Sequence, residues 1–100
     1  VLPADVPDAY VVHQGEVASR QAFKLANDLR GNGLRVVLHC GGGSFKSQFK
    51  KADASGARFA VVIGEEEAAG GKAAVKRLNG EGAGEQTVLP VAEVVQYLRG

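Results

Sequence analysis

The sequence predicts an α/β domain whose mixed sheet carries helices on its faces. Three observations support this fold class: a strand–helix–strand pattern over residues 9–40, a continuous apolar run in RFAVVIG (58–64), and helical spacing of apolar residues over 91–98. A helix between two strands returns the chain to the same end of a sheet, which favours a parallel pair. At 100 residues, the chain has room for one domain and none for a second.

The first strand–helix–strand unit can be read from two kinds of apolar spacing. AYVVH (9–13) and LRVVLHC (34–40) are short runs rich in β-branched residues, as is typical of buried strands. Between them, apolar residues recur along one side of a helix. This stripe consists of Ala18, Ala22, Leu25, Ala26 and Leu29.

A second helix is predicted directly after the turn GGGS (41–44). Ser44 is its expected N-cap, and Gly56 is its expected stop because glycine readily adopts the left-handed conformation that ends helices. Phe45, Phe49 and Ala52 repeat at i, i+4 and i+7, so we expect them to form the buried stripe.

The second half of the chain continues from the strand at 58–64. EEEAAGG (65–71) reads as an acidic turn with room for one turn of helix. KAAVKRL (72–78) and EQTVLP (85–90) flank a glycine-rich hairpin and are predicted as strands. The closing helix is predicted from the i, i+3, i+4, i+7 spacing of Val91, Val94, Val95 and Leu98.

Composition excludes several classes of protein. One cysteine, Cys40, excludes an internal disulfide, and with His13 and His39 it lacks the spacing of a metal site. No catalytic set is evident, and the apolar runs are too short to span a membrane. The proline-punctuated segment VLPADVPD (1–8) reads as a linker or arm leading into a domain at 9–100. Because it lacks a basic signal region, we expect a cytoplasmic protein.

Charge is distributed unevenly along the chain. The net charge of +1 excludes a uniformly basic nucleic-acid-binding surface. Residues 41–80, however, hold seven basic and four acidic side chains. A polyanion contact is therefore expected in this segment, with an ordinary solvated surface as the alternative.

Two segments have compositions that suit ligand binding. The glycines of GGGSFKSQFK (41–50) would let backbone N–H groups and a helix start approach a phosphate or a base edge. The alternative is a strand-to-helix turn that needs glycine for its dihedral angles. Glu65, Glu66 and Glu67 follow the strand at 58–64, where a carboxylate can accept a hydrogen bond from a base. A solvated acidic turn is the alternative there.

Two segments of the chain resemble the C-terminal anticodon-binding domain of bacterial histidyl-tRNA synthetases. They are HCGGGSFKSQFKKADASGARFAVVIGEEE (39–67) and, after it, GGKAAVKRLNGEGAGEQTVLP (70–90). The resemblance runs from about Ala9 to Leu98. It implies a three-layer α/β/α domain with a five-stranded mixed sheet, one strand of which is antiparallel to the rest. It also implies that this domain is non-catalytic and holds no cofactor.

The resemblance further implies a parent enzyme that joins histidine to its tRNA, using ATP and Mg at an earlier catalytic domain. Expected partners are the anticodon loop of tRNA, the catalytic domain of the parent chain, and a second copy of the parent in a homodimer. No membrane is expected among them. Carried over to this sequence, the anticodon contacts fall on Glu67, after the third strand, and on Lys76, in the fourth. Gly42, Lys46 and Gln48 are added from the segment 41–50.

Two other functions fit parts of the pattern. A small flavodoxin-like nucleotide-binding protein could use the glycine turn for a phosphate. A synthetase-like interaction domain of a regulatory protein could keep the fold without binding tRNA. On the main interpretation, the glycine turn, the lysine-bearing helix, Glu67 and Lys76 should converge on one rim of the molecule.

Overall fold

The computed structural model of the chain describes residues 7–39, 43–78, 80 and 82–99. Within these residues the predicted order of elements is confirmed, and the acidic turn forms a helix of its own. The elements are β1 (Ala9–His13), α1 (Glu16–Gly31), β2 (Val36–Leu38), α2 (Phe45–Ser55), β3 (Phe59–Ile63), α3 (Glu65–Gly70), β4 (Lys72–Arg77), β5 (Gln86–Pro90) and α4 (Val91–Arg99). No described helix is long and apolar enough to cross a membrane.

The five strands form one mixed sheet in the order β2-β1-β3-β4-β5. β1 pairs in parallel with both β2 and β3, whereas β4 pairs antiparallel with β3 and β5. The carboxyl ends of β1, β2, β3 and β5 therefore meet at one end of the sheet, which is also where β4 begins. The expected five-stranded mixed sheet is thus confirmed.

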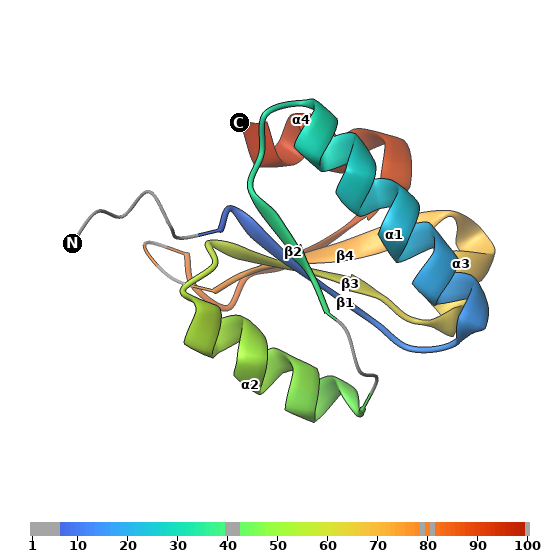
Figure 1. The fold of residues 1–100 in the computed structure, drawn as a ribbon, viewed down its shortest axis with the longest axis horizontal. Coiled ribbons are helices and arrows are strands. Elements are labelled where there is room, and N and C mark those ends of the chain that lie inside the picture. Colours follow the sequence, from blue (N-terminus) through green and yellow to red (C-terminus); the bar gives the residue numbers. More distant parts are fainter. Residues whose placement is uncertain (1–6, 40–42, 79, 81, 100) are drawn as a thin grey trace.

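Helices cover the two faces of the sheet unequally (Figure 1). One face packs against α1, α3 and α4, which supply Leu25, Ala68 and Val94 to the larger core cluster. The other face packs against α2 alone, through a smaller cluster that includes Tyr10, Val62 and Ala52. The arrangement is the three-layer α/β/α fold that the sequence led us to expect.

Several local predictions hold. All five residues of the predicted α1 stripe are buried, and none is more than 1% exposed. Ser44 caps α2 by accepting a hydrogen bond from the Ser47 amide at 3.3 Å. Gly56 ends the same helix in the left-handed conformation, with φ of 78°.

β2 is shorter than the predicted strand at 34–40. The Leu34 amide donates to the Leu29 carbonyl at 3.1 Å, so this residue still closes the end of α1 and the strand starts only at Val36. Cys40 lies outside the described residues, as do residues 1–6 of the predicted arm. Of that arm, Asp8 is tied to the sheet because its amide donates to the Arg35 carbonyl at 2.8 Å.

The buried stripe of α2 differs from the prediction. Phe45 and Phe49 are only partly buried, whereas Gln48 is fully buried beside Ala52. The Gln48 amide makes three hydrogen bonds, all of them to backbone groups. Its Oε1 accepts from the His13 amide at 2.9 Å, and its Nε2 donates to the carbonyls of His13 at 2.8 Å and Gly43 at 3.0 Å. One side chain thus holds the start of α2 against the carboxyl end of β1.

We predict that Gln48→Leu destabilises the domain by about 3 kcal/mol, because it removes the three hydrogen bonds of a fully buried amide and leaves backbone groups of His13 and Gly43 without these partners. Leucine has a similar volume, so packing is largely kept. Gln96→Leu, on the exposed side of α4, is the matched control and should change the free energy of unfolding by less than about 0.5 kcal/mol. Urea unfolding measures both, and equal stability of the two variants would contradict the anchoring role.

Candidate nucleic-acid interface

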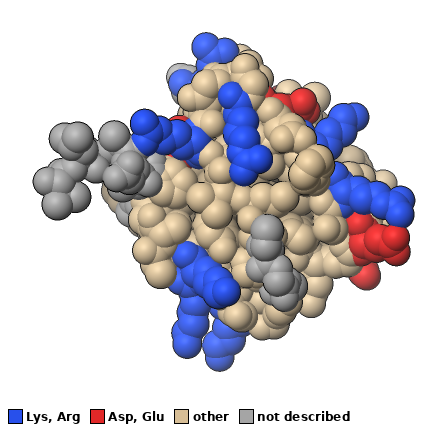
Figure 2. Space-filling model, viewed as in Figure 1, with Lys and Arg blue, Asp and Glu red and all other residues tan. Residues whose placement is uncertain are grey.

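The candidate site begins where β3 ends and the first turns of α2 and α3 meet. A hollow of about 480 Å³ opens there, lined by Gln14, Phe45, Gly64, Glu65, Glu66 and Glu67. In Figure 2 the largest group of acidic side chains lies over the starts of α1 and α3, and lysine side chains extend over α2. The hollow therefore combines carboxylate acceptors with one aromatic ring.

Glu67 lies in the first turn of α3 and is partly buried. Its Oε1 accepts from the Gly64 amide at 2.9 Å, which caps the helix. A Cβ atom at Gly64 would lie 2.8 Å from Glu67 Oε1 and 3.6 Å from the Phe45 ring, so the lack of a side chain here lets the carboxylate approach the Gly64 amide closely. The carboxylate is thus fixed at the wall of the hollow, and its second oxygen is available to a ligand.

Lys76 lies near the other end of the sheet. It is partly buried on β4, opposite Ala60 of β3, and its Nζ is 5.2 Å from the centre of the Phe49 ring. Such contact with an aromatic face restrains a cation while leaving it charged. Because Ala60 precedes Gly64 by four strand residues, Lys76 is about 13 Å along the sheet from the hollow.

The predicted convergence on one rim is therefore wrong for Lys76. β4 runs antiparallel to β3, so it carries residue 76 away from the turn that holds Glu67. Lys76 faces the α2 side of the sheet, whereas Glu67 lies beyond the end of β3 in the first turn of α3, and each is near a phenylalanine of α2. Phe45 and Phe49 join the two positions, since their ring centres are 6.4 Å apart.

The α2 side of β4 and β5 forms an open sheet face. Strand alternation places Lys72, Ala74 and Lys76 on it, paired in register with Pro90, Val88 and Gln86. Val88 is 55% exposed, which shows that α2 does not extend over this part of the sheet. Lys72 is exposed at the hollow end of β4. Lys72 was not among the predicted site residues, although its i, i+4 spacing from Lys76 places both lysines on one face of a strand.

The remaining predicted site residues have three different positions. Lys46 is exposed in the first turn of α2. Gly42 lies outside the described residues. Gln48 is 0% exposed, so the prediction that its side chain contacts RNA is wrong: the side chain anchors α2 to the end of β1 and is not part of the binding surface.

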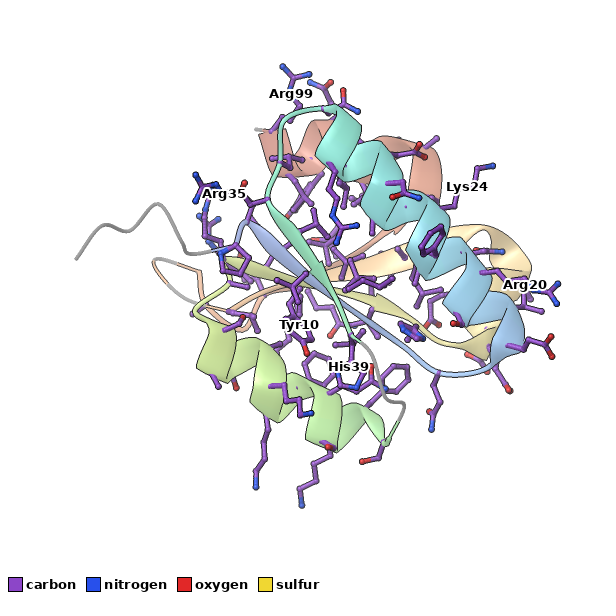
Figure 3. The ribbon with its side chains drawn as sticks, in the orientation of Figure 1. Tyr10, Arg20, Lys24, Arg35, His39 and Arg99 are labelled. Carbon is purple, nitrogen blue, oxygen red and sulfur yellow. The ribbon has the colours of Figure 1, made fainter. Side chains whose placement is uncertain are left out.

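The two histidines are bonded into the structure on the α2 side of the sheet, where Figure 3 shows Tyr10 and His39 beside α2. The Tyr10 hydroxyl and His39 Nδ1 are hydrogen-bonded at 2.9 Å, and His13 Nε2 is bonded to the His39 carbonyl at the same distance. Among the described residues, no group of three or more His, Cys, Asp and Glu side chains could hold a metal ion.

Comparison with known proteins identifies relatives along nearly the whole chain. The chain is 56% identical over 97 residues to the histidine–tRNA ligase of Dechloromonas aromatica, and 58% identical over 99 residues to that of Thiobacillus denitrificans. These matches cover 97% and 99% of this chain, but only 22% and 23% of the two relatives. The chain thus spans under a quarter of their length.

Solved structures show the same fold. The histidyl-tRNA synthetase of S. aureus matches 96% of this chain, and 24% of its own, with a TM-score of 0.84 and 33% identity. The RNA-binding domain of threonyl-tRNA synthetase from Cryptosporidium parvum matches 93% of this chain and 23% of its own with a TM-score of 0.82, and at 17% identity it supports the fold alone. A family model described as an anticodon binding domain matches residues 8–100. The chain belongs to the anticodon-binding domain family.

Proposed function

We propose that this chain is the anticodon-recognition domain of a histidyl-tRNA synthetase and that it binds the anticodon loop of histidine tRNA. The observation that carries the proposal is the open sheet face of β4 and β5 together with the hollow near the start of β4: the hollow holds the Glu67 carboxylate, and the face holds the restrained cation of Lys76. Family membership and the names of the relatives supply the class of RNA. An anticodon loop offers unstacked bases, the form of RNA that proteins read by its edges.

The hollow suits the recognition of a base. The free oxygen of Glu67 can accept a hydrogen bond from a base amino or imino group, and Glu65 and Glu66 add acceptors nearby. Because these carboxylates would repel a phosphate, the hollow favours base edges over backbone. Lys76 and Lys46 would then contact the phosphates, as single charges that lack the paired hydrogen bonds of an arginine.

The proposal extends to the parent protein. Its activity is the ATP- and Mg-dependent ligation of histidine to tRNA, carried out by a catalytic domain elsewhere in the parent, which works in the cytoplasm as a homodimer. The part of the relatives that this chain does not span supports a separate catalytic domain. The flavodoxin-like alternative finds no support in the comparisons. The interaction-domain alternative predicts no binding to histidine tRNA, so RNA titration separates it from the proposal.

We expect Glu67→Gln to reduce the preference for the matching anticodon hairpin, over a hairpin with a permuted loop, by about tenfold. The amide keeps an oxygen for the Gly64 N–H, so helix capping and stability are largely retained while the charge is lost. Fluorescence titration of both hairpins measures the preference. Glu93→Gln, on exposed α4, is the control, and an unchanged preference in Glu67→Gln would reject base reading by this residue.

Lys76→Gln should weaken binding to both hairpins by about threefold, because a phosphate contact carries no sequence information. The slope of log affinity against log salt concentration should also fall, by about 0.7 to 1. Lys24→Gln, on the exposed side of α1, removes the same charge from the opposite face of the sheet (Figure 3). If the Lys24 and Lys76 variants have the same salt slope, Lys76 makes no phosphate contact.

A further inference from the structure

A row of arginines lies at the end of the sheet where β1, β2 and β3 begin and β4 ends. Arg35 directly precedes β2, Arg58 directly precedes β3, and Arg77 is the last residue of β4. The strand register aligns them, since Ala9 pairs with both Val36 and Phe59, and Phe59 pairs with Arg77. We call Arg35, Arg58 and Arg77 the arginine edge.

Two of these guanidinium groups are held by one aromatic ring. The Cζ atoms of Arg58 and Arg77 lie 5.5 and 5.3 Å from the centre of the Phe59 ring. Tyr97 contacts the same ring edge-on at 6.0 Å, and Phe59 is only 5% exposed. Packing of this kind orients the planar groups before a ligand arrives, so less conformational entropy is lost on binding.

Few carboxylates pair with the guanidinium groups of the arginine edge among the described residues. The Asp8 carboxylate bridges two of its members, accepting from the Arg35 backbone amide at 2.9 Å and forming a 3.5 Å ion pair with Arg58. The Arg58 side chain remains 51% exposed. The structure describes no carboxylate paired with the side chains of Arg35 or Arg77. A polyanion would therefore meet charged groups that are already in place.

The row is also long enough for more than one anionic group. The row spans four neighbouring strands, from β2 across β1 and β3 to β4, so three strand spacings separate its ends, a distance of about 14 Å. Arginine binds phosphate with two parallel hydrogen bonds, which makes it better suited than lysine to a repeating phosphate backbone.

We propose that the arginine edge binds backbone phosphates of the anticodon stem, at a position separate from the base-reading hollow. The inference rests on the proposed function. Arg58 lies six residues before Gly64, about 20 Å from the hollow, so RNA with its loop bases in the hollow would place paired stem nucleotides here. Arg77 follows Lys76 on β4 and, by strand alternation, points to the α4 side, where it packs against Phe59, so the arginine edge is a separate group of cations from the lysines of the open sheet face. Its spacing across neighbouring strands suits a repeating phosphate backbone, which favours the same RNA over an acidic protein partner.

The experiment compares the unaltered chain with Arg35→Gln, Arg58→Gln, Arg77→Gln and the triple variant. The RNA probes are the anticodon hairpin of histidine tRNA, the hairpin with a permuted loop, and the loop sequence as a single strand without its stem; polyglutamate is the acidic polypeptide probe. The triple variant should bind both hairpins about tenfold more weakly, with a lower salt slope and an unchanged preference between loops. Binding of the stemless strand should be unchanged.

Arg20→Gln is the matched control because it removes the same charge at the opposite end of the sheet, where Figure 3 shows Arg20 far from Arg35. Thermal unfolding measures whether each variant keeps the stability of the unaltered chain. The Arg35 side chain has no described hydrogen bond or ion pair, so Arg35→Gln tests the arginine edge even if Arg77→Gln loses stability. Hairpin affinity equal to that of the Arg20 variant would overturn the proposal, as would equal weakening for the stemless strand. Edge variants that affect only binding of polyglutamate would also overturn it, in favour of an acidic protein partner.

The proposed function and this inference can fail separately. If the unaltered chain binds both hairpins equally well, anticodon reading is rejected. The arginine edge is tested separately, by whether its variants weaken binding of the hairpins but not of the stemless strand. If the unaltered chain binds none of the three RNAs at low salt, both are rejected.

Discussion

The candidate site depends on one buried amide, the side chain of Gln48. Its three hydrogen bonds reach only backbone atoms, so they fix the start of α2 relative to the end of β1 whatever side chains surround them. With α2 held there, the Phe45 ring lies against Gly64. A Cβ atom at Gly64 would lie 3.6 Å from that ring and 2.8 Å from Glu67 Oε1, the atom that accepts from the Gly64 amide. The proposed base acceptor is thus positioned beside a ring of the helix that Gln48 anchors.

Uneven covering of the sheet creates the open face. Five strands span about 20 Å, whereas one helix is about 10 Å across, so α2 can shield only part of the sheet on its side. It lies over β1 and β3, because the chain enters it from β2 and leaves it into β3. β4 and β5 are joined by a hairpin and bring no further helix to this side. Val88 is left exposed, and lysines rather than apolar residues accompany Ala74 on β4.

The fold could be predicted largely from the sequence because its signals are local. The α1 stripe, the apolar run of β3 and the caps at Ser44 and Gly56 each depend on residues within a few positions of one another. Gln48 could not be predicted as buried, because a polar residue beside lysines reads as exposed and its partner His13 is 35 residues away. The placement of Lys76 failed for a related reason, since spacing does not reveal that β4 reverses direction and moves this residue away from Glu67.

The antiparallel direction of β4 places two kinds of functional residue at its two ends. The strand begins beside the hollow with Lys72, passes Lys76 on the open face and ends in the arginine edge with Arg77. On the proposed function, one strand therefore connects two kinds of recognition. Acceptors in the hollow act over hydrogen-bond distances and depend on base identity, whereas the cations act on phosphates over a longer range and are weakened by salt. The hollow and the arginine edge lie at opposite ends of the strand. A change in the arginine edge can therefore alter RNA affinity while the loop preference, which the hollow sets, stays the same.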